Sequence, residues 1–364
     1  MNHRFLLPLP QNRVRRNYHG GAGLDRLAGN PSPADGNRPE NWVCSLVPAT
    51  NPGLPPVADE GLSFVELDGM RRLLRDVFAA APEHYLGAAH VSRRGMDPGF
   101  LTKQLDSSMR LHLQAHPTRE FARRHLGRPW GKFEAYVILA ARPGCEPFIR
   151  LGFQHPPTPE EWLRIVLEQD IAAMDACFEP VPVRPGEVWF VPGGLPHAIG
   201  GGLTVLEIME PSDLVVRCEF EREGIVVPPA ARFMGCEPAD ALRIFDFTPW
   251  PLTAVREKLR VAPRVLREGR GFTESLLIGP RQIDCFEVRE VAVHAPATLS
   301  LDERFAIGIA CAGTARISAG DGGRMEARAG SAFFAAAAAR ELSIVPANGP
   351  FVLHLCLPGA CAPE

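Results

Sequence analysis

GEVWFVPGGLPH, residues 186–197, is the stretch of this chain that says most about its fold. Its first part, residues 187–191, is rich in the apolar, β-branched and aromatic residues that favour a β-strand. Pro192 and Gly194 then predict a tight turn, because proline fixes φ and glycine accepts a positive φ. His197 follows directly after this turn. The stretch therefore predicts a strand and a turn that aim one histidine side chain.

The same stretch resembles the second motif of the cupins, which are small jelly-roll barrels. From Gly186 to His197 the order is glycine, five residues, proline, one residue, glycine, two residues and histidine. The resemblance implies that His197 is a metal ligand inside such a barrel. The asparagine that closes the motif is missing, since position 201 is Gly201, and we therefore expect no ligand there.

Composition agrees with a chain of short strands. The 364 residues include 34 glycines and 36 prolines, which is too many chain-breaking residues for a protein made mostly of long helices. Apolar residues make up 46% and charged residues 22%, as in ordinary globular domains. The net charge of −3 leaves no basic excess for a phosphate backbone, so we expect no nucleic-acid partner.

Cysteine usage and hydropathy predict a cytoplasmic protein. No apolar run is long enough to cross a membrane, and the N-terminal apolar patch is broken by Pro8 and Pro10, unlike a signal peptide. We expect the nine cysteines to be unpaired thiols in a reducing compartment. They are scattered and form no CxxC pair: Cys44, Cys145, Cys177, Cys218, Cys236, Cys285, Cys311, Cys356 and Cys361.

Two helices are predicted within an otherwise β-rich chain. The first spans residues 68–80, where apolar residues recur at helical spacing. The second starts at Thr158, which forms a predicted capping box with Glu161 and is followed by Pro159. The first stripe is Met70, Leu73, Leu74, Val77 and Phe78, and the second is Leu163, Val166, Leu167, Ile171 and Met174.

Strand patterns divide the rest of the chain. Residues 132–139 predict a strand with two alternating faces. One face would carry Lys132, Glu134, Tyr136 and Ile138, and the other Phe133, Ala135, Val137 and Leu139. Further β-type runs lie at 203–209, 214–220 and throughout 272–357. We predict a mainly β protein of two tandem cupin barrels, with helical insertions in the metal-binding N-terminal half. The boundaries are a catalytic domain over 1–235 with an insertion near 158–175, a connection over 236–265, and a second β domain over 266–364.

A second group of polar residues precedes this strand. In an extended segment, His112, Gln114 and His116 point to one side, where buried polar groups need partners. With Glu134 and His197, the residues Gln114 and His116 make a set of nitrogen and oxygen ligands without thiolates. Such a set suits zinc with an open position, or another divalent metal, and two histidines with a carboxylate also suit non-haem iron.

These segments, in this order, resemble type I mannose-6-phosphate isomerase, a zinc-dependent cupin enzyme. The phrases are LTKQLDSSMRLHLQAHP at 101–117, GKFE at 131–134, VPGGLPHAIGGG at 191–202 and LEIMEPSDLVVR at 206–217, with ENWVCS at 40–45 before them. The resemblance covers about residues 12–222. It implies one zinc ion per chain, held by Gln114, His116, Glu134 and His197, with Arg217 catalytic.

Aldose–ketose isomerisation moves a proton between C1 and C2 through a cis-enediol, and it needs a proton carrier and fixed positive charge. Glu207 and Lys132 are the two candidate carriers, and the sequence does not choose between them. Arg217 supplies a permanent charge. Lys103 is a candidate substrate-binding residue. His112 is a second one, and it stands where the family tends to have a serine, which leaves the phosphorylation of the substrate open.

The second β domain carries no predicted metal site. When Gly330 is aligned with Gly186, Ala336 and Ala338 replace the turn residues and Glu341 replaces the histidine. A short helix through the alanines is the alternative to a degenerate barrel. In both cases we expect this domain to contribute packing and stability.

We therefore expect an isomerase that interconverts mannose 6-phosphate and fructose 6-phosphate, with a small sugar phosphate as its partner. An isomerase of an unphosphorylated or different sugar, a non-catalytic sugar-binding regulatory cupin and, more distantly, an iron oxygenase are the alternatives.

Overall fold

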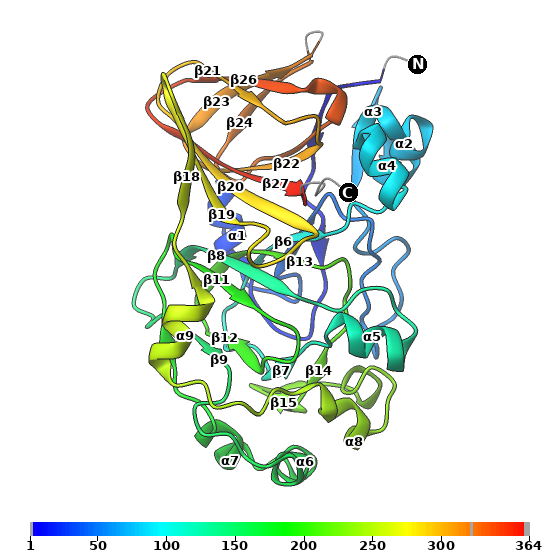
Figure 1. Cartoon of the computed structure of the whole chain (residues 1–364), viewed down its shortest axis with the longest axis vertical. Coiled ribbons are helices and arrows are strands. Elements are labelled where there is room, and N and C mark those ends of the chain that lie inside the picture. Colours follow the sequence, from blue (N-terminus) through cyan, green and yellow to red (C-terminus); the bar gives the residue numbers. More distant parts are fainter. Residues whose placement is uncertain (1–2, 321–322, 360–364) are drawn as a thin grey trace.

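The structure is a computed structural model that describes residues 3–320 and 323–359. It holds two β regions stacked along the long axis, with the chain's C-terminal part at the top of Figure 1. All strand pairs within the sheets are antiparallel, and the sheets face one another in four layers. The prediction of a mainly β protein with two jelly-roll barrels, and helices inserted in the first half, is confirmed.

The first barrel pairs a seven-stranded sheet with a five-stranded one. The larger sheet runs β17 (Arg260–Val261), β11 (Val188–Val191), β8 (Glu134–Ala141), β13 (Leu203–Met209), β6 (Leu101–Asp106), β3 (Glu40–Val43), β2 (Arg13–Val14). The smaller sheet runs β10 (Val181–Pro182), β9 (Phe148–Leu151), β12 (His197–Ile199), β7 (Gln114–Ala115), β14 (Val216–Arg217).

The second barrel repeats this plan. Its larger sheet runs β1 (Leu6–Leu9), β25 (Ala332–Ala335), β22 (Ala306–Ala312), β27 (Phe351–Pro358), β20 (Phe286–Val293), β19 (Phe272–Ile278), β18 (Arg264–Gly269). Its smaller sheet runs β21 (Ala297–Ser300), β26 (Glu341–Pro346), β23 (Thr314–Ala319), β24 (Gly323–Arg328). Strand β1 joins this sheet through its pairing with β25, so the beginning of the chain packs with its end.

The two seven-stranded sheets pack against each other through a shared apolar core. Ala135, Val137 and Ile208 of the first barrel lie in one cluster with Val288 and Ile307 of the second. On the opposite face of β8, Tyr136 and Ile138 belong to the cluster inside the first barrel. The predicted alternation along 132–139 therefore holds, and one strand serves two cores because its side chains point alternately to the two faces.

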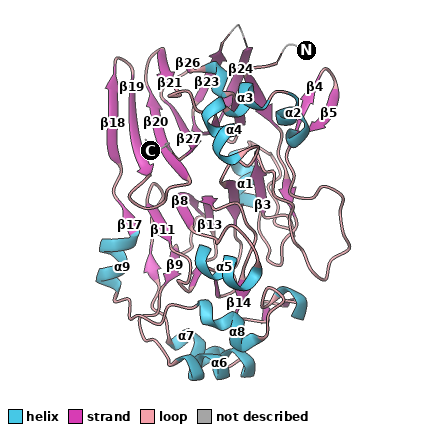
Figure 2. Cartoon of the chain, turned by 45° about the vertical axis from the view of Figure 1, so that its right-hand side comes forward, coloured by secondary structure: helices cyan, strands magenta, loops and turns pink. Residues whose placement is uncertain are grey.

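Helices cover the edges and the outer face. Next to the second barrel lie α2 (Leu74–Ala80), α3 (Pro82–Leu86) and α4 (Ala88–Arg94), as Figure 2 shows. The outer face of the five-stranded sheet is covered by α6 (Pro159–Glu168), α7 (Ile171–Ala176), α8 (Pro238–Ala241) and η2 (Leu242–Ile244). The remaining helices are α1 (Ala22–Leu27), α5 (Arg119–Leu126), α9 (Leu252–Leu259), η1 (Pro229–Ala231) and η3 (Ala337–Ala339). Two hairpins complete the structure: β4 (Phe64–Leu67) pairs with β5 (Met70–Leu73), and β15 (Glu221–Arg222) pairs with β16 (Ile225–Val226). No helix in the described ranges is long and apolar enough to cross a membrane.

The helix predicted over 68–80 is wrong in its first half. Asp68 and Gly69 both have a positive φ and make the two-residue turn of the β4–β5 hairpin, as Asp-Gly pairs favour. Met70, in the predicted apolar stripe, is consequently exposed. The helix begins at Leu74, and its buried side chains are Leu74, Val77 and Phe78.

The second helix begins as predicted but has a different buried face. Thr158 and Glu161 form both hydrogen bonds of the capping box. Gln169 then adopts a left-handed conformation and separates α6 from α7. The buried residues of α6 are Trp162, Ile165 and Val166, whereas the predicted stripe residue Leu167 is exposed.

The alanine run of the second barrel forms a short helix within a degenerate barrel, so both predicted alternatives are present. Strand β25 ends at Ala335, the 3-10 helix η3 follows, and β26 begins at Glu341. The short helix thus replaces the turn that precedes His197 in the first barrel. Glu341, which is aligned with His197, is exposed, and Ala336, which is aligned with Pro192, is buried. Only the apolar alanine side chain therefore points into the protein from these two positions. The eight cysteines within the described ranges are unpaired, and Cys361 lies outside them.

Candidate functional site

Three buried side chains from different strands of the first barrel meet at one point. His116 follows β7, Glu134 begins β8, and His197 begins β12. Oε1 of Glu134 lies 2.9 Å from Nε2 of His116, and Oε2 lies 3.5 Å from Nε2 of His197. One ligand atom from each residue lies within 4.8 Å of the others. This is a group that fits a metal ion.

The rings of both histidines are held in the orientation that metal binding requires. Nδ1 of His116 lies 2.8 Å from the carbonyl oxygen of Leu214, and Nδ1 of His197 lies 2.9 Å from that of Leu195. A carbonyl acceptor keeps the proton on Nδ1 and leaves the Nε2 lone pair free as a ligand. The two Nε2 atoms that face Glu134 are therefore the available ligand atoms.

The charge states also suit a metal. Burial lowers the pKa of His116 to about 3 and lowers the pKa of His197, so both rings are neutral at pH 7. Burial alone would raise the pKa of Glu134, but His116 and Lys132 outweigh it and hold this pKa well below its usual range. Two neutral imidazoles and one carboxylate are a donor set typical of zinc and other divalent metals.

Gln114 and Lys132 flank this group. Nε2 of the Gln114 side chain lies 3.3 Å from Nε2 of His197, and the opposite rotamer of the amide would present its oxygen there. Nζ of Lys132 lies 2.8 Å from Oε1 of Glu134 and 3.2 Å from Nε2 of His116. Nearby carboxylates, Glu134 foremost, overcome the effect of burial and raise the pKa of Lys132, so it is an ammonium. All four residues predicted as ligands are thus brought together.

The turn before His197 depends on glycine. Gly194 has a φ of +91°, and its N–H donates to the carbonyl of His116 over 2.7 Å. A Cβ at this position would lie 2.8 Å from the carbonyl oxygen of Ile244. Only glycine meets both requirements without strain. The turn thus ties the loop that carries His197 directly to the backbone of His116.

A cluster of buried charges forms one wall beside the metal-binding group. Arg16 donates to Asp213 over 2.6 Å and 3.0 Å and to Glu40 over 2.9 Å. Lys103 lies 3.6 Å from Glu40, 3.9 Å from Asp213 and 3.5 Å from Glu207. Burial and the carboxylate of Glu134 raise the pKa of Glu207 to about 8. Glu207 is therefore mostly protonated at neutral pH, despite Lys103.

Two further predicted residues face the same space. His112 is buried, its Nε2 has no hydrogen-bond partner among the described residues, and burial lowers its pKa to about 4. The Arg217 guanidinium makes no ion pair within the described chain and donates to the carbonyl of Ala231 over 2.7 Å. Burial, assisted by Arg16, lowers the pKa of Arg217 to about 10. An arginine without a carboxylate partner is free to receive an anion.

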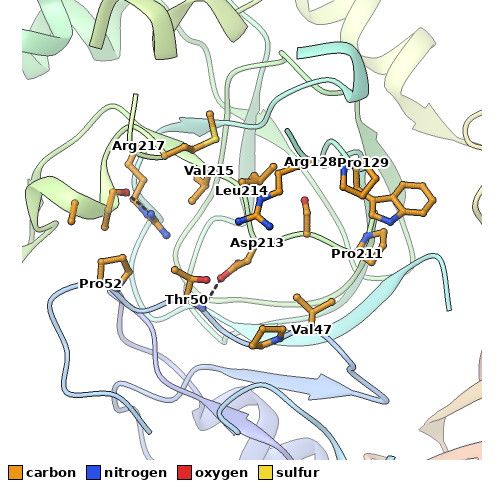
Figure 3. Close-up of a pocket in the computed structure, with 17 residues that line it drawn as sticks. Val47, Thr50, Pro52, Arg128, Pro129, Pro211, Asp213, Leu214, Val215 and Arg217 are labelled. Carbon is orange, nitrogen blue, oxygen red and sulfur yellow. Dashed lines mark hydrogen bonds between the residues drawn. The ribbon is translucent and has the colours of Figure 1, made fainter. Parts of the chain in front are cut away.

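The space has an outer and an inner part. The outer pocket is about 580 Å³, and the guanidinium groups of Arg217 and Arg128 enter it from opposite sides (Figure 3). The inner part is a recess of about 40 Å³. Arg217, Asp213 and Val215 line both. The recess also touches Gln114, Lys132, Glu207, Lys103 and His112.

Sequence patterns missed part of this site. Arg16 and Asp213 are 197 positions apart; Asp213 lies within the phrase at 206–217, but neither residue was singled out as a site residue. Arg128, in the loop after α5, was missed as well. The resemblance of ENWVCS to a family phrase pointed to residues 40–45, and Glu40 proves to be a partner of Arg16.

No protein-family model matches the chain. The mannose-6-phosphate isomerase of Streptococcus mutans serotype c (strain ATCC 700610 / UA159) is 30% identical over 216 residues, which are 58% of this chain and 60% of that protein. Mannose-6-phosphate isomerase ManA of Bacillus subtilis (strain 168) is 34% identical over 125 residues, 34% of this chain and 38% of that protein. The chain thus matches less than two thirds of the length of each relative.

Solved structures match over nearly the whole chain. The crystal structure of the mannose 6-phosphate isomerase from Bacillus subtilis superposes with a TM-score of 0.73 and 19% identity, covering 97% of this chain and 99% of that one. A holo, zinc-bound mannose 6-phosphate isomerase gives a TM-score of 0.70 and 18% identity, covering 98% and 100%. At these identities the likeness is one of fold.

Proposed function

We propose that the chain belongs to the mannose-6-phosphate isomerase family and is a metal-dependent aldose–ketose isomerase that interconverts mannose 6-phosphate and fructose 6-phosphate. The observation that carries the proposal is the buried group of His116, Glu134 and His197, together with a neighbouring pocket lined by Arg217 and Arg128, whose guanidinium groups form no ion pair within the described residues. The first supplies ligands for a metal, and the second supplies charge for an anionic substrate.

The proposed metal is one zinc ion per chain, held by Gln114, His116, Glu134 and His197. Both imidazoles are neutral and fixed through Nδ1, which supports this assignment. A related structure is described as holo and zinc bound. When bound, the ion would act as a Lewis acid for the oxygen atoms at C1 and C2.

The chain's own residues would handle the proton and the charge. We assign the transfer between C1 and C2 to Glu207 or Lys132, which both line the recess. A carrier works best when its pKa lies near the working pH, which favours Glu207. Lys132, as an ammonium, would stabilise negative charge on the cis-enediol. Arg217 would add fixed positive charge, and Lys103 would bind the substrate.

The outer pocket supports a phosphorylated substrate. Arg217 and Arg128 form no ion pair within the described residues, and both point into this pocket (Figure 3). A phosphate accepts paired hydrogen bonds from guanidinium groups. We assign the phosphate end of the sugar to the outer pocket and the C1 and C2 end to the metal-binding group.

The second candidate function is isomerisation of an unphosphorylated or different sugar, which His112 in the recess favours. A non-catalytic sugar-binding protein has less support, because such a protein needs no group of metal ligands. We also propose the division into 1–235, 236–265 and 266–364, with the metal site in the first part and the cytoplasm as the location.

The test is a coupled assay of the purified protein with mannose 6-phosphate and free mannose, before and after chelation. We expect turnover of the phosphorylated sugar that chelation abolishes and zinc restores. Equal activity without metal, or a preference for free mannose, would refute the proposal. A sugar-induced rise in melting temperature without turnover would instead support the binding protein.

A further inference from the structure

Two buried polar atoms in the inner recess have no hydrogen-bond partner among the described residues. They are Nδ2 of Asn17, from the segment between β2 and α1, and Nε2 of His112, from the segment between β6 and β7. Both residues line the recess. A buried polar group without a partner destabilises the structure, because it has lost its hydrogen bonds to water. Such atoms are commonly completed by a ligand or by ordered water.

The two atoms have complementary hydrogen-bonding characters. Asn17 presents an amide N–H donor. A neutral imidazole carries a proton on one ring nitrogen and a lone pair on the other, and in the tautomer with the proton on Nδ1 the unpartnered Nε2 of His112 accepts. A hydroxyl group both donates and accepts, so it satisfies this pair. The fully ionised phosphate of a sugar phosphate offers only acceptors and leaves Nε2 without a donor.

The recess holds these two residues firmly. Arg16, directly before Asn17, and Tyr18, directly after it, both donate to Glu40, over 2.9 Å and 2.8 Å. Asn17 is therefore fixed from both sides. His112 is 3% exposed. A site that is rigid before the ligand arrives loses little ordering entropy on binding.

The size of the recess limits what enters it. At about 40 Å³ it has room for a few water-sized groups. It shares Arg217, Asp213 and Val215 with the outer pocket and touches Gln114 and Lys132, which flank the metal-binding group. A substrate with its phosphate in the outer pocket and C1 and C2 at the metal-binding group would turn a middle hydroxyl toward this recess.

We propose that Asn17 and His112 form a subsite that reads one hydroxyl group of the sugar, at C3 or C4, and thereby select polyhydroxylated sugar substrates. This inference rests on the proposed function for the position of the sugar. It adds Asn17, which no sequence pattern indicated. It also gives His112 a role as a specificity residue that hydrogen-bonds the substrate rather than its phosphate.

The experiment compares the full-length wild type with Asn17→Leu and His112→Phe. His112→Gln serves as the conservative rescue, and His155→Phe, on an exposed side chain, is the matched control. For each protein, kcat/KM is measured with mannose 6-phosphate and with its 3-deoxy and 4-deoxy analogues. Melting temperatures without ligand verify folding. Shifts caused by each sugar and by inorganic phosphate give a readout of binding that is independent of turnover.

We expect the wild type to prefer mannose 6-phosphate over one deoxy analogue by about 10-fold or more, since that analogue leaves both atoms unpaired. Asn17→Leu and His112→Phe should lose this preference, and His112→Gln should restore part of it. The shift caused by inorganic phosphate should persist in every variant. An unchanged preference in both variants would overturn the inference and leave the proposed isomerase standing.

If the wild type turns over none of these sugars, the proposed function fails, and the shifts in melting temperature decide the subsite. A hydroxyl-dependent shift that vanishes in the two variants supports it. Sugar-induced shifts that are equal in the wild type and both variants, or the lack of any shift in the wild type, refute it.

Discussion

Replacing Arg16 by methionine removes the cation of a buried cluster and keeps much of the side chain's volume. Arg16, Glu40 and Asp213 have side chains that are 5%, 7% and 9% exposed. The guanidinium donates to both carboxylates, and Lys103 is a further cationic neighbour, 3.6 Å from Glu40 and 3.9 Å from Asp213. Breaking a buried pair in this way costs roughly 3–5 kcal/mol. We expect Arg16→Met to lower the free energy of unfolding by about that amount.

The loss should depend on pH in a defined direction. In the wild type, burial acts to raise the pKa of Glu40, but Arg16 and Lys103 outweigh it and hold this pKa at about 2, below the ordinary 4.5. This contribution to stability is present above about pH 4.5 and is lost as the pH falls toward 2. Without Arg16, burial is less opposed, and the pKa values of Glu40 and Asp213 rise. We expect both pKa values to rise above their unfolded values, so that stability falls as the pH rises through them. The penalty should therefore be larger at pH 8 than at pH 5.

Urea unfolding at these two pH values, followed by tryptophan fluorescence, measures the effect. Trp42 is a suitable probe because it is buried, donates to Glu40 over 2.6 Å, and has the Arg16 guanidinium 4.9 Å from its ring centroid. Arg13→Met is the matched control. Arg13 pairs with Asp25 nearer the surface, so its loss should cost about 1 kcal/mol or less.

Adding Asp213→Asn to Arg16→Met should recover part of the stability, since it removes one stranded charge. The reasoning is refuted if Arg16→Met costs no more than Arg13→Met, or if its penalty is the same at both pH values.

Three further predictions concern the metal, the turn and the core. Zinc at about 100 times its dissociation constant should stabilise the protein by roughly 2.7 kcal/mol, which raises its melting temperature. Glu134→Gln should lose most of this rise in melting temperature. An equal rise in the variant would contradict the assigned ligands. Gly194→Ala should lower the free energy of unfolding by roughly 1–3 kcal/mol, measured by chemical denaturation, and weaken zinc binding. Gly186→Ala, at a similar positive φ but with open space around its Cβ, should cost less in the same assay. Equal losses in the two variants would show that the contact with Ile244 does not explain the need for Gly194. Phe286 lies in the core between the two large sheets, and Phe286→Ala should lower the free energy of unfolding by roughly 3–5 kcal/mol in the same assay. The control Val265→Ala, at an exposed side chain, should cost less than about 0.5 kcal/mol. Similar losses in both variants would contradict the shared core.

Local patterns predicted what depends on neighbours in the chain. The capping box at Thr158, the alternation along 132–139 and the strand–turn–strand around His197 all follow from residues a few positions apart. The helix predicted over 68–80 failed because a periodic stripe does not reveal that Asp68 and Gly69 turn the chain. The stripe of α6 was displaced because the sheet it covers selects the buried face.

By itself the sequence determined a β-rich chain, a glycine-shaped turn that aims His197, and four ligand-type residues in three segments. Only the tertiary structure decided that Arg16 meets Asp213, that β1 completes the second barrel, and that Asn17 and His112 share one recess. The physical reason is distance along the chain. Hydrogen bonds, ion pairs and burial between remote segments depend on how the sheets pack, and no periodicity in the sequence records that packing.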